Sequence, residues 1–241
     1  MIGALGVLMF IPMAVDLAHG DESWRAFATS GFLTTLFGAV MSLTSFTRSA
    51  NLRARGAFLL TTLSWVGMSI FAALPLLLAP IGLNVTDSLF EAVSGITTTG
   101  STVMTGLDDA PKGVLLWRAI LQWIGGVGII VTAMAILPML NIGGMQLFRL
   151  ESSDVSDKAL PKAAQLAAAI GIIYLTLTIL CMAGYMIAGM SSFDAIAHAM
   201  TTLATGGYST SDASMGGFMD GGADLVAIAF MLAGALPFGM Y

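Results

Sequence analysis

The sequence predicts an all-α integral membrane protein: a helical hairpin followed by two parallel repeats of helix, re-entrant loop and helix. Apolar residues make up 57% of the 241 residues and charged residues only 10%, whereas soluble domains carry about 25% charged residues. Six apolar stretches are long enough for a membrane helix, which needs roughly 20 residues. Two short segments rich in glycine and threonine occupy equivalent places between these stretches. The chain is therefore expected to cross the membrane several times and to contain a duplicated element.

The N-terminal transmembrane hairpin is expected over residues 1–50. Its two spans, 1–18 and 26–46, are joined by a short polar turn. No basic residue precedes the first apolar run and further spans follow it, so we expect a membrane span rather than a cleaved signal peptide. Asp16 is the only acid well inside an expected span, and the sequence offers it no partner.

The first repeat is expected over residues 51–141. Its spans at 57–79 and 114–140 flank a short amphipathic segment whose N-cap is Thr86 or Asp87. That segment holds about 10 residues, which is too few to cross a bilayer. We therefore expect a half-helix that enters the membrane and turns back.

A cytoplasmic connector is expected over residues 142–162, and the second repeat over 163–241. The second repeat has spans at 163–190 and 223–241 with another amphipathic segment between them, and it ends early in its last helix. The outer spans of both units run in the same direction, so the repeat is parallel and not inverted.

A non-helical loop follows each short segment. The first loop reads SGITTTGST over 94–102, and the second reads TTLATGGYS over 201–209. Such loops are tolerated at membrane depth only where they line a cavity or are buried in protein. Carbonyl oxygens can replace the water around a cation, glycine permits the positive φ that turns them toward one axis, and the C-terminal end of a half-helix favours positive charge. The pair of loops predicts a cation permeation pathway rather than an active site.

The sequence allows two registers between the repeats. Each loop follows a Phe-acid-Ala segment, at 90–92 in the first repeat and at 193–195 in the second. If these segments correspond, the second half-helix is longer by three residues. Whether Gly206 or Gly207 matches Gly100 then stays open.

The distribution of basic residues indicates the orientation. Two loops hold most of them, and the positive-inside rule places these loops in the cytoplasm. These residues are Arg48, Arg53, Arg55, Arg149, Lys158 and Lys162. Both glycine-threonine loops and most acids then face outside, where negative charge raises the local cation concentration.

Two charged residues are expected to support the first half-helix. An unpaired Arg118 near the outer end of its span would cost at least about 2–3 kcal/mol on insertion scales, and Glu91 lies on the half-helix before it. We expect a structural pair between them; a K⁺ site at Glu91 in the outer mouth is the competing interpretation. For His198 we expect a buried structural hydrogen bond rather than a proton relay.

The chain resembles the Trk-type potassium-uptake membrane proteins, in the TrkH branch of the Trk/Ktr/HKT superfamily. Three stretches carry the resemblance: SLFEAVSGITTTGSTVMTGLD, WRAILQWIGGVGIIVTAMAILPMLNIGGMQLFR and FDAIAHAMTTLATGGYSTSDAS. The resemblance implies that this chain is the N-terminal half of a protein with four helix–pore loop–helix repeats around one K⁺-channel-like pore. It also implies a selectivity filter, with K⁺ at Thr99, Gly100, Thr205 and Gly206. The implied filter residues are Thr98, Thr99, Gly100 and Ser101 in the first loop, and Thr205, Gly206, Gly207 and Tyr208, preceded by Ala204, in the second.

The implied function is K⁺ uptake across the bacterial inner membrane, with Na⁺ or H⁺ as a coupled ion still open. The resemblance also implies a homodimer of the full-length protein and a cytosolic nucleotide-binding regulatory ring as partner. Neither an organic cofactor nor a nucleic acid is expected, and no enzyme activity, since protease motifs such as His-Glu-x-x-His are missing from the sequence. The alternative is a non-conducting fragment, or a regulatory or scaffold subunit, that needs a second half or chain to close a pore.

Overall fold

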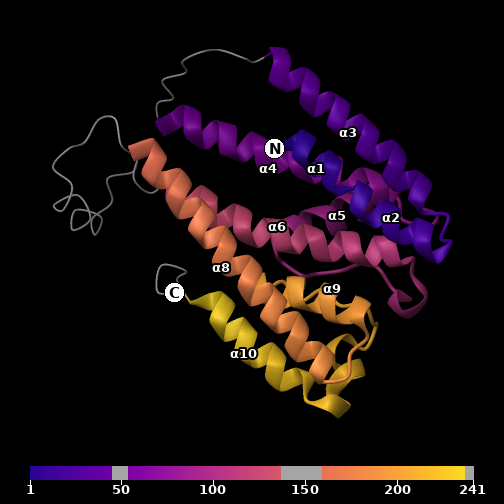
Figure 1. The fold of residues 1–241 in the computed structure, drawn as a ribbon. Coiled ribbons are helices and arrows are strands. Elements are labelled where there is room, and N and C mark those ends of the chain that lie inside the picture. Colours follow the sequence, from indigo (N-terminus) through magenta and orange to yellow (C-terminus); the bar gives the residue numbers. More distant parts are fainter. Residues whose placement is uncertain (45–53, 137–158, 237–241) are drawn as a thin grey trace.

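The computed structural model describes residues 1–44, 54–136 and 159–236. Every regular element in these ranges is a helix, so the predicted fold class is confirmed (Figure 1). Most of the expected cytoplasmic connector and the end of the last expected span lie outside the described residues.

The N-terminal hairpin consists of α1 (Ile2–Leu8), α2 (Phe10–His19) and α3 (Trp24–Thr44). α1 and α2 form one span with an interruption at Met9. Pro12 accounts for it, because proline has no N–H to donate to the carbonyl four residues earlier.

The first repeat runs from α4 (Ala54–Leu78) through the half-helix α5 (Val85–Ile96) and a 3₁₀ turn, η1 (Leu107–Asp109), to α6 (Lys112–Ile136). α5 contacts both α4 and α6. Its 12 residues place the first loop beside the middle of longer helices (Figure 1).

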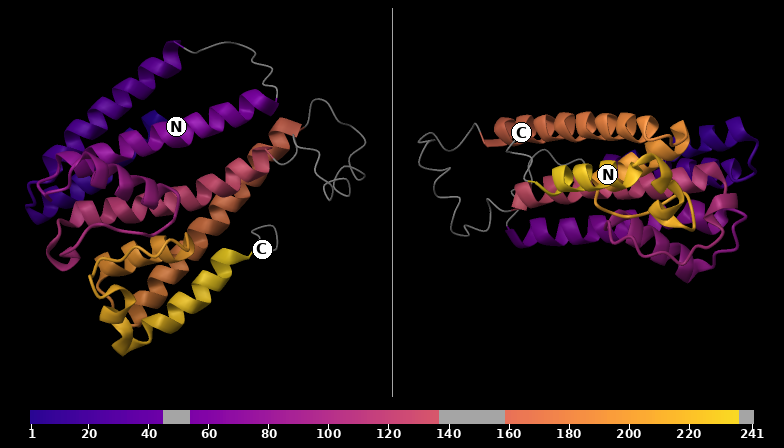
Figure 2. Two further views of the ribbon diagram at one scale, coloured as in Figure 1. Left: turned by 180° about the vertical axis from the view of Figure 1, so that it is seen from behind. Right: turned by 90° about the horizontal axis from the view of Figure 1, so that it is seen from below.

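The second repeat has the same order of elements. It comprises α8 (Ala159–Ile187), the half-helix α9 (Ser192–Leu203), η3 (Ser214–Gly221) and α10 (Ala223–Ala235). α9 contacts α8 and α10 of its own repeat and also α6 of the first. Therefore α6 is the helix that both half-helices share, and both sides of Figure 2 show it between the two units.

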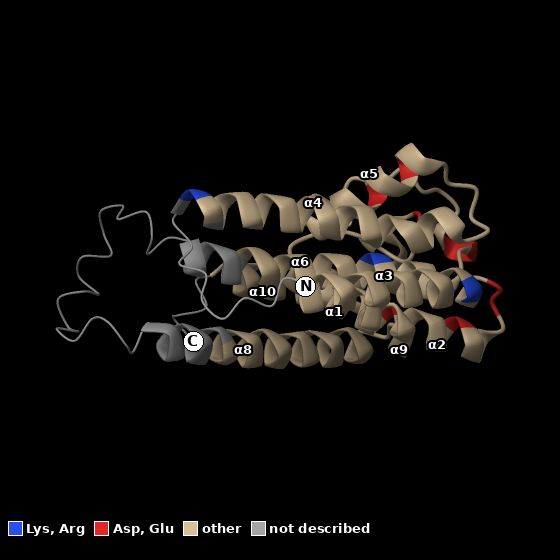
Figure 3. Ribbon diagram, turned by 90° about the horizontal axis from the view of Figure 1, so that it is seen from above, with Lys and Arg blue, Asp and Glu red and all other residues tan. Residues whose placement is uncertain are grey.

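The outer surface suits a lipid environment. In the described residues, four helical stretches are long and apolar enough to cross a membrane: Ile2–His19, Trp24–Thr44, Phe58–Leu78 and Ala168–Ile187. Large apolar side chains on them point outward, as in Leu63, which is 66% exposed. Figure 3 shows Asp and Glu gathered mainly at one end of the bundle, the end that holds the turn after α2.

Candidate functional site

Both half-helices begin with an N-cap side chain that accepts a hydrogen bond from the backbone N–H three residues later. The Asn84 side chain accepts a hydrogen bond from the backbone N–H of Asp87 (2.9 Å), and Ser191 Oγ accepts one from the N–H of Asp194 (3.1 Å). Such caps satisfy a free N–H in the first turn of a helix. The first half-helix therefore begins earlier than predicted, since Asn84, and neither Thr86 nor Asp87, is its N-cap.

The loops that follow share one backbone shape. Thr98 and Thr205 both adopt a left-handed conformation, with φ of 57° and 50°. Two residues later, Gly100 and Gly207 do the same, with φ of 79° and 85°. Left-handed backbone is costly for residues other than glycine, so its recurrence in both loops marks corresponding positions.

These correspondences resolve the register between the repeats. The same offset of 107 in residue number separates the two N-caps, the two left-handed threonines and the two left-handed glycines. Gly207, rather than Gly206, is therefore the counterpart of Gly100. The two half-helices have 12 residues each, so the longer second half-helix expected from the Phe-acid-Ala segments is wrong. On the observed register Glu91 corresponds to His198, and Asp87 to Asp194.

Peptide geometry turns several carbonyls away from the half-helices. The N–H that follows Thr98 donates to the carbonyl of Ser94 (2.9 Å), and the N–H that follows Thr205 donates to that of Thr201 (2.8 Å). In a trans peptide the C=O points opposite to the N–H, and the described residues contain no cis peptide. The Thr98 and Thr205 carbonyls therefore point away from the helices that support them.

The other expected filter residues differ in accessibility. Thr99 and Gly207 lie on the exposed side of their loops, whereas Gly206 is buried, with its carbonyl oxygen against Gly100 and its Cα against the Gln122 amide. The carbonyl of Ser101 is turned back, because it accepts a hydrogen bond from Ser94 Oγ (2.6 Å).

Glu91 and Arg118 meet behind the first loop. Arg118 Nε donates to Glu91 Oε1 at 2.7 Å, and both side chains are almost fully buried. The carboxylate also accepts hydrogen bonds from Thr102 Oγ1 (2.9 Å) and from the N–H of Val103 (3.1 Å). The pair thus joins the half-helix α5, the returning loop and α6.

Arg118 and Gln122 extend from the first repeat to the second loop. An Arg118 terminal nitrogen donates to the carbonyl of Ser209 (3.0 Å), and its guanidinium carbon lies 4.2 Å from the ring centroid of Tyr208. Gln122 Oε1, one turn further along α6, accepts a hydrogen bond from the N–H of Tyr208 (3.1 Å). By the same peptide geometry, this bond turns the Gly207 carbonyl away from α6.

The second loop is held to its own half-helix by His198 and Asp194. His198 Nδ1 lies 2.8 Å from the carbonyl of Asp194, and Nε2 lies 2.9 Å from Ser209 Oγ. A carbonyl only accepts, so Nδ1 carries a proton. Thr210 Oγ1 adds a hydrogen bond to Asp194 (2.6 Å).

The side chains of Arg118 and Gln122, which reach from α6 to the second loop, are together called the Arg118–Gln122 arm. The second repeat has no equivalent of this arm among its described residues. Gly125 of α6 and Gly234 of α10 each lie against the carbonyl of the last residue of the preceding half-helix, so these glycines correspond. Counting back from them, Ala227 stands in the place of Arg118 and Met231 in that of Gln122. Both line a cavity of about 150 Å³ beside His198.

Residues 23–241 match the family model for TrkH, described as a cation transport protein. The chain belongs to the TrkH family. It is 44% identical over 238 residues to the Trk system potassium uptake protein TrkI of Halomonas elongata, which covers 98% of this chain and 48% of that protein. It is 42% identical over 244 residues to TrkH of Vibrio parahaemolyticus, covering 100% of this chain and 50% of that protein.

The crystal structure of the potassium transporter TrkH from Vibrio parahaemolyticus has the same fold. It superposes with a TM-score of 0.89 at 39% sequence identity, over 99% of this chain and 48% of that one. The family expected from the motifs is thus confirmed, and this TrkH-family chain spans about half the length of the relatives it matches.

The hairpin of this TrkH-family chain supports α6 through two carboxylates. Asp16, which was expected to have no partner, accepts a hydrogen bond from the backbone N–H of Gly113, and Asp21 accepts one from that of Lys112 (3.3 Å). These are free N–H groups in the first turn of α6, where negative charge is favourable. No sequence pattern predicts this contact, because the partners are backbone groups almost a hundred residues away.

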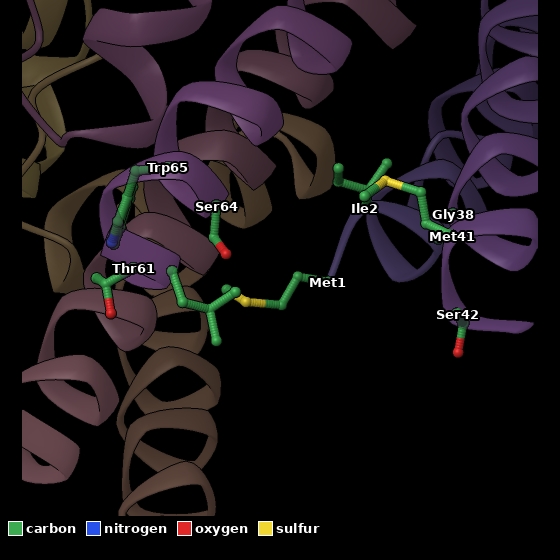
Figure 4. A pocket seen from close by; sticks show the side chains of 10 residues that line it. Met1, Ile2, Gly38, Met41, Ser42, Thr61, Ser64 and Trp65 are labelled. Atoms are coloured by element: carbon green, nitrogen blue, oxygen red, sulfur yellow. The ribbon is translucent and has the colours of Figure 1, made fainter. Parts of the chain in front are cut away.

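A larger cavity lies between the N-terminal hairpin and α4. It has a volume of about 420 Å³ between α1, α3 and α4, and Trp65, Thr61 and Ser64 line one side of it, opposite Gly38 and Met41 (Figure 4). None of the expected filter residues borders it.

Proposed function

We propose that the complete protein takes up K⁺ across the bacterial cytoplasmic membrane through a selectivity filter, to which this chain contributes two re-entrant loops. The observation that carries this proposal is the pair of loops with one backbone shape, each placed at the C-terminal end of a half-helix. The names of the relatives, which are potassium uptake proteins, support K⁺ as the ion.

In the proposed filter, backbone carbonyls replace part of the hydration shell of K⁺. Those of Thr98 and Thr205 are favoured because they turn away from the half-helices, and that of Gly207 because it turns away from α6. The other residues proposed for the filter are Thr99, Gly100 and Gly206. Glu91 and Arg118 are proposed as structural support rather than as an ion site, because their mutual contact and their bonds to the loop occupy them.

The orientation and the partners are also proposals. We infer that the loops open to the outside, since most acids share their end of the molecule, and that the basic loops are cytoplasmic. The family resemblance supports a homodimer of the complete protein and a cytosolic nucleotide-binding regulatory ring. It leaves open whether K⁺ passes the filter passively or is coupled to Na⁺ or H⁺.

Growth of a bacterial strain that lacks K⁺ uptake tests the proposal. The full-length protein should restore growth at low K⁺ and should take up Rb⁺, a tracer for K⁺, while an empty vector should do neither. Full-length protein that reaches the membrane folded but gives no uptake of either ion would contradict the proposal.

The alternative, a non-conducting subunit, makes a different prediction for residues 1–241 expressed alone. Two loops line only part of a pore, so we expect this fragment not to restore growth by itself. Coexpression with the remaining half should restore growth if the two parts assemble into one pore. Restoration by the fragment alone would instead favour assembly from two copies of this chain.

A further inference from the structure

One aromatic side chain crosses from the second loop to the first repeat. Tyr208 directly follows Gly207, and its ring is buried against Gly95 of the half-helix α5 and beneath the Arg118 guanidinium. Its hydroxyl donates to the carbonyl of Glu91 on α5 at 2.9 Å and is shared with the carbonyl of Ser101, 3.3 Å away in the first loop. The side chain of one loop therefore contacts both the helix and the loop of the other repeat.

The backbone of Tyr208 is fixed as well. Its N–H donates to Gln122 Oε1. This N–H belongs to the same peptide unit as the carbonyl of Gly207. A shift of the Tyr208 ring would therefore move a carbonyl of the proposed filter. Because a filter discriminates between ions through the number and placement of its carbonyl oxygens, such a shift should alter selectivity before it alters the fold.

We propose that the Tyr208 side chain is a positioning residue that sets the spacing between the two loops, and thereby the preference for K⁺ over Na⁺. The inference rests on the proposed function. It adds a contact between the repeats that is made by the hydroxyl and the ring of one side chain. This contact is distinct from the backbone carbonyls that would face the ion. The first repeat has no such side chain to offer, because Ser101 stands at the position that corresponds to Tyr208.

Tyr208→Phe in the full-length protein tests this contact. It keeps the ring under Arg118 and removes only the hydroxyl. We expect the amount of folded protein to be unchanged and Na⁺ to inhibit Rb⁺ uptake at about fivefold lower concentration, the scale expected for one lost net hydrogen bond.

Tyr185→Phe is the matched control. Tyr185 is also fully buried, and its hydroxyl lies 2.6 Å from Thr202 Oγ1 on α9, within the second repeat. It makes no contact between the two repeats through this hydroxyl bond. This variant loses a comparable hydrogen bond, so its thermal stability should fall while its inhibition by Na⁺ stays that of the unaltered protein.

Gln122→Ala gives a second test if Tyr208→Phe does not fold. It releases the Tyr208 N–H from α6, so inhibition by Na⁺ should shift in the same direction as in Tyr208→Phe. Unchanged selectivity in either folded variant, beside an active unaltered protein, would overturn the role of Tyr208 and leave the proposed function in place. Absence of Rb⁺ uptake in the unaltered protein would overturn the proposed function and this inference with it.

Discussion

The two repeats hold loops of the same shape by different chemistry. In the first repeat a buried carboxylate, Glu91, and a buried guanidinium, Arg118, hold the returning loop. In the second, His198 occupies the place of Glu91, and Ala227 that of Arg118. Both charges of this pair are present in one repeat and both are replaced in the other, so the shared loop shape does not require the ion pair.

The difference indicates what the charged pair adds. Arg118 contacts its own loop and also the carbonyl of Ser209 in the next repeat, and Gln122 contacts the Tyr208 backbone. The corresponding positions of the second repeat border a cavity instead. The ion pair is therefore best understood as the support of an arm that joins the two loops, with Glu91 compensating the charge that the arm carries.

The largest expected effect comes from breaking the charged pair. Glu91→Gln or Arg118→Gln leaves one buried charge without its partner, which typically costs about 3–5 kcal/mol. We expect a strong fall in the yield and thermal stability of the full-length protein. His198→Gln in the second repeat removes only neutral hydrogen bonds and should cost about 1–2 kcal/mol.

Replacing the pair together sharpens the same comparison. Glu91→His combined with Arg118→Ala gives the first repeat the residues of the second. Because no buried charge is left unpaired, this double variant should be more stable in thermal melts than either single charge-removing variant. If it is less stable than both, the two charges do not act as a pair, and Glu91 as an ion site would regain support.

A smaller difference is expected between the two left-handed glycines. A side chain at Gly100 would be strained at φ 79° and would also collide with the carbonyl oxygen of Gly206, whereas Gly207 has open space around it. Gly207→Ala should therefore cost only the strain of about 1–2 kcal/mol, and Gly100→Ser should cost more because the loops must separate. Melting temperatures of the two variants compare these costs, and equal losses would show that the loops are not in contact at this point.

The caps of the half-helices should show no difference between repeats. Asn84→Ala and Ser191→Ala each remove one side-chain acceptor for a first-turn N–H, which costs about 1 kcal/mol. Similar small losses in thermal stability are expected, with unchanged discrimination against Na⁺. A much larger loss for one cap would mean that the repeats also differ at the start of their half-helices.

Much of this fold follows from local patterns in the sequence. Span length and hydrophobicity predict the helices, and a 10-residue amphipathic segment between spans predicts a half-helix such as α5. The pairing of Glu91 with Arg118 also follows from the cost of a lone arginine at that depth, and the structure brings the two into contact.

Register and long-range contacts are what the sequence left open. The Phe-acid-Ala segments favoured a wrong alignment because two similar residue triplets carry less information than backbone conformation, which φ at Thr98 and Thr205 reveals directly. The partners of Asp16 and of the Tyr208 hydroxyl are backbone groups, N–H in one case and C=O in the other. Every residue carries such groups, so residue identity gives no signal for these contacts.

The central claim is that the two glycine-containing loops select the transported ion, with Gly207 as the counterpart of Gly100. Rb⁺ uptake by the full-length protein in competition with Na⁺, measured for the unaltered protein and for Gly207→Ala, tests it most directly. The account predicts uptake that resists Na⁺ in the unaltered protein and weaker discrimination in a folded, membrane-inserted Gly207→Ala variant. Unchanged discrimination in that variant would contradict it.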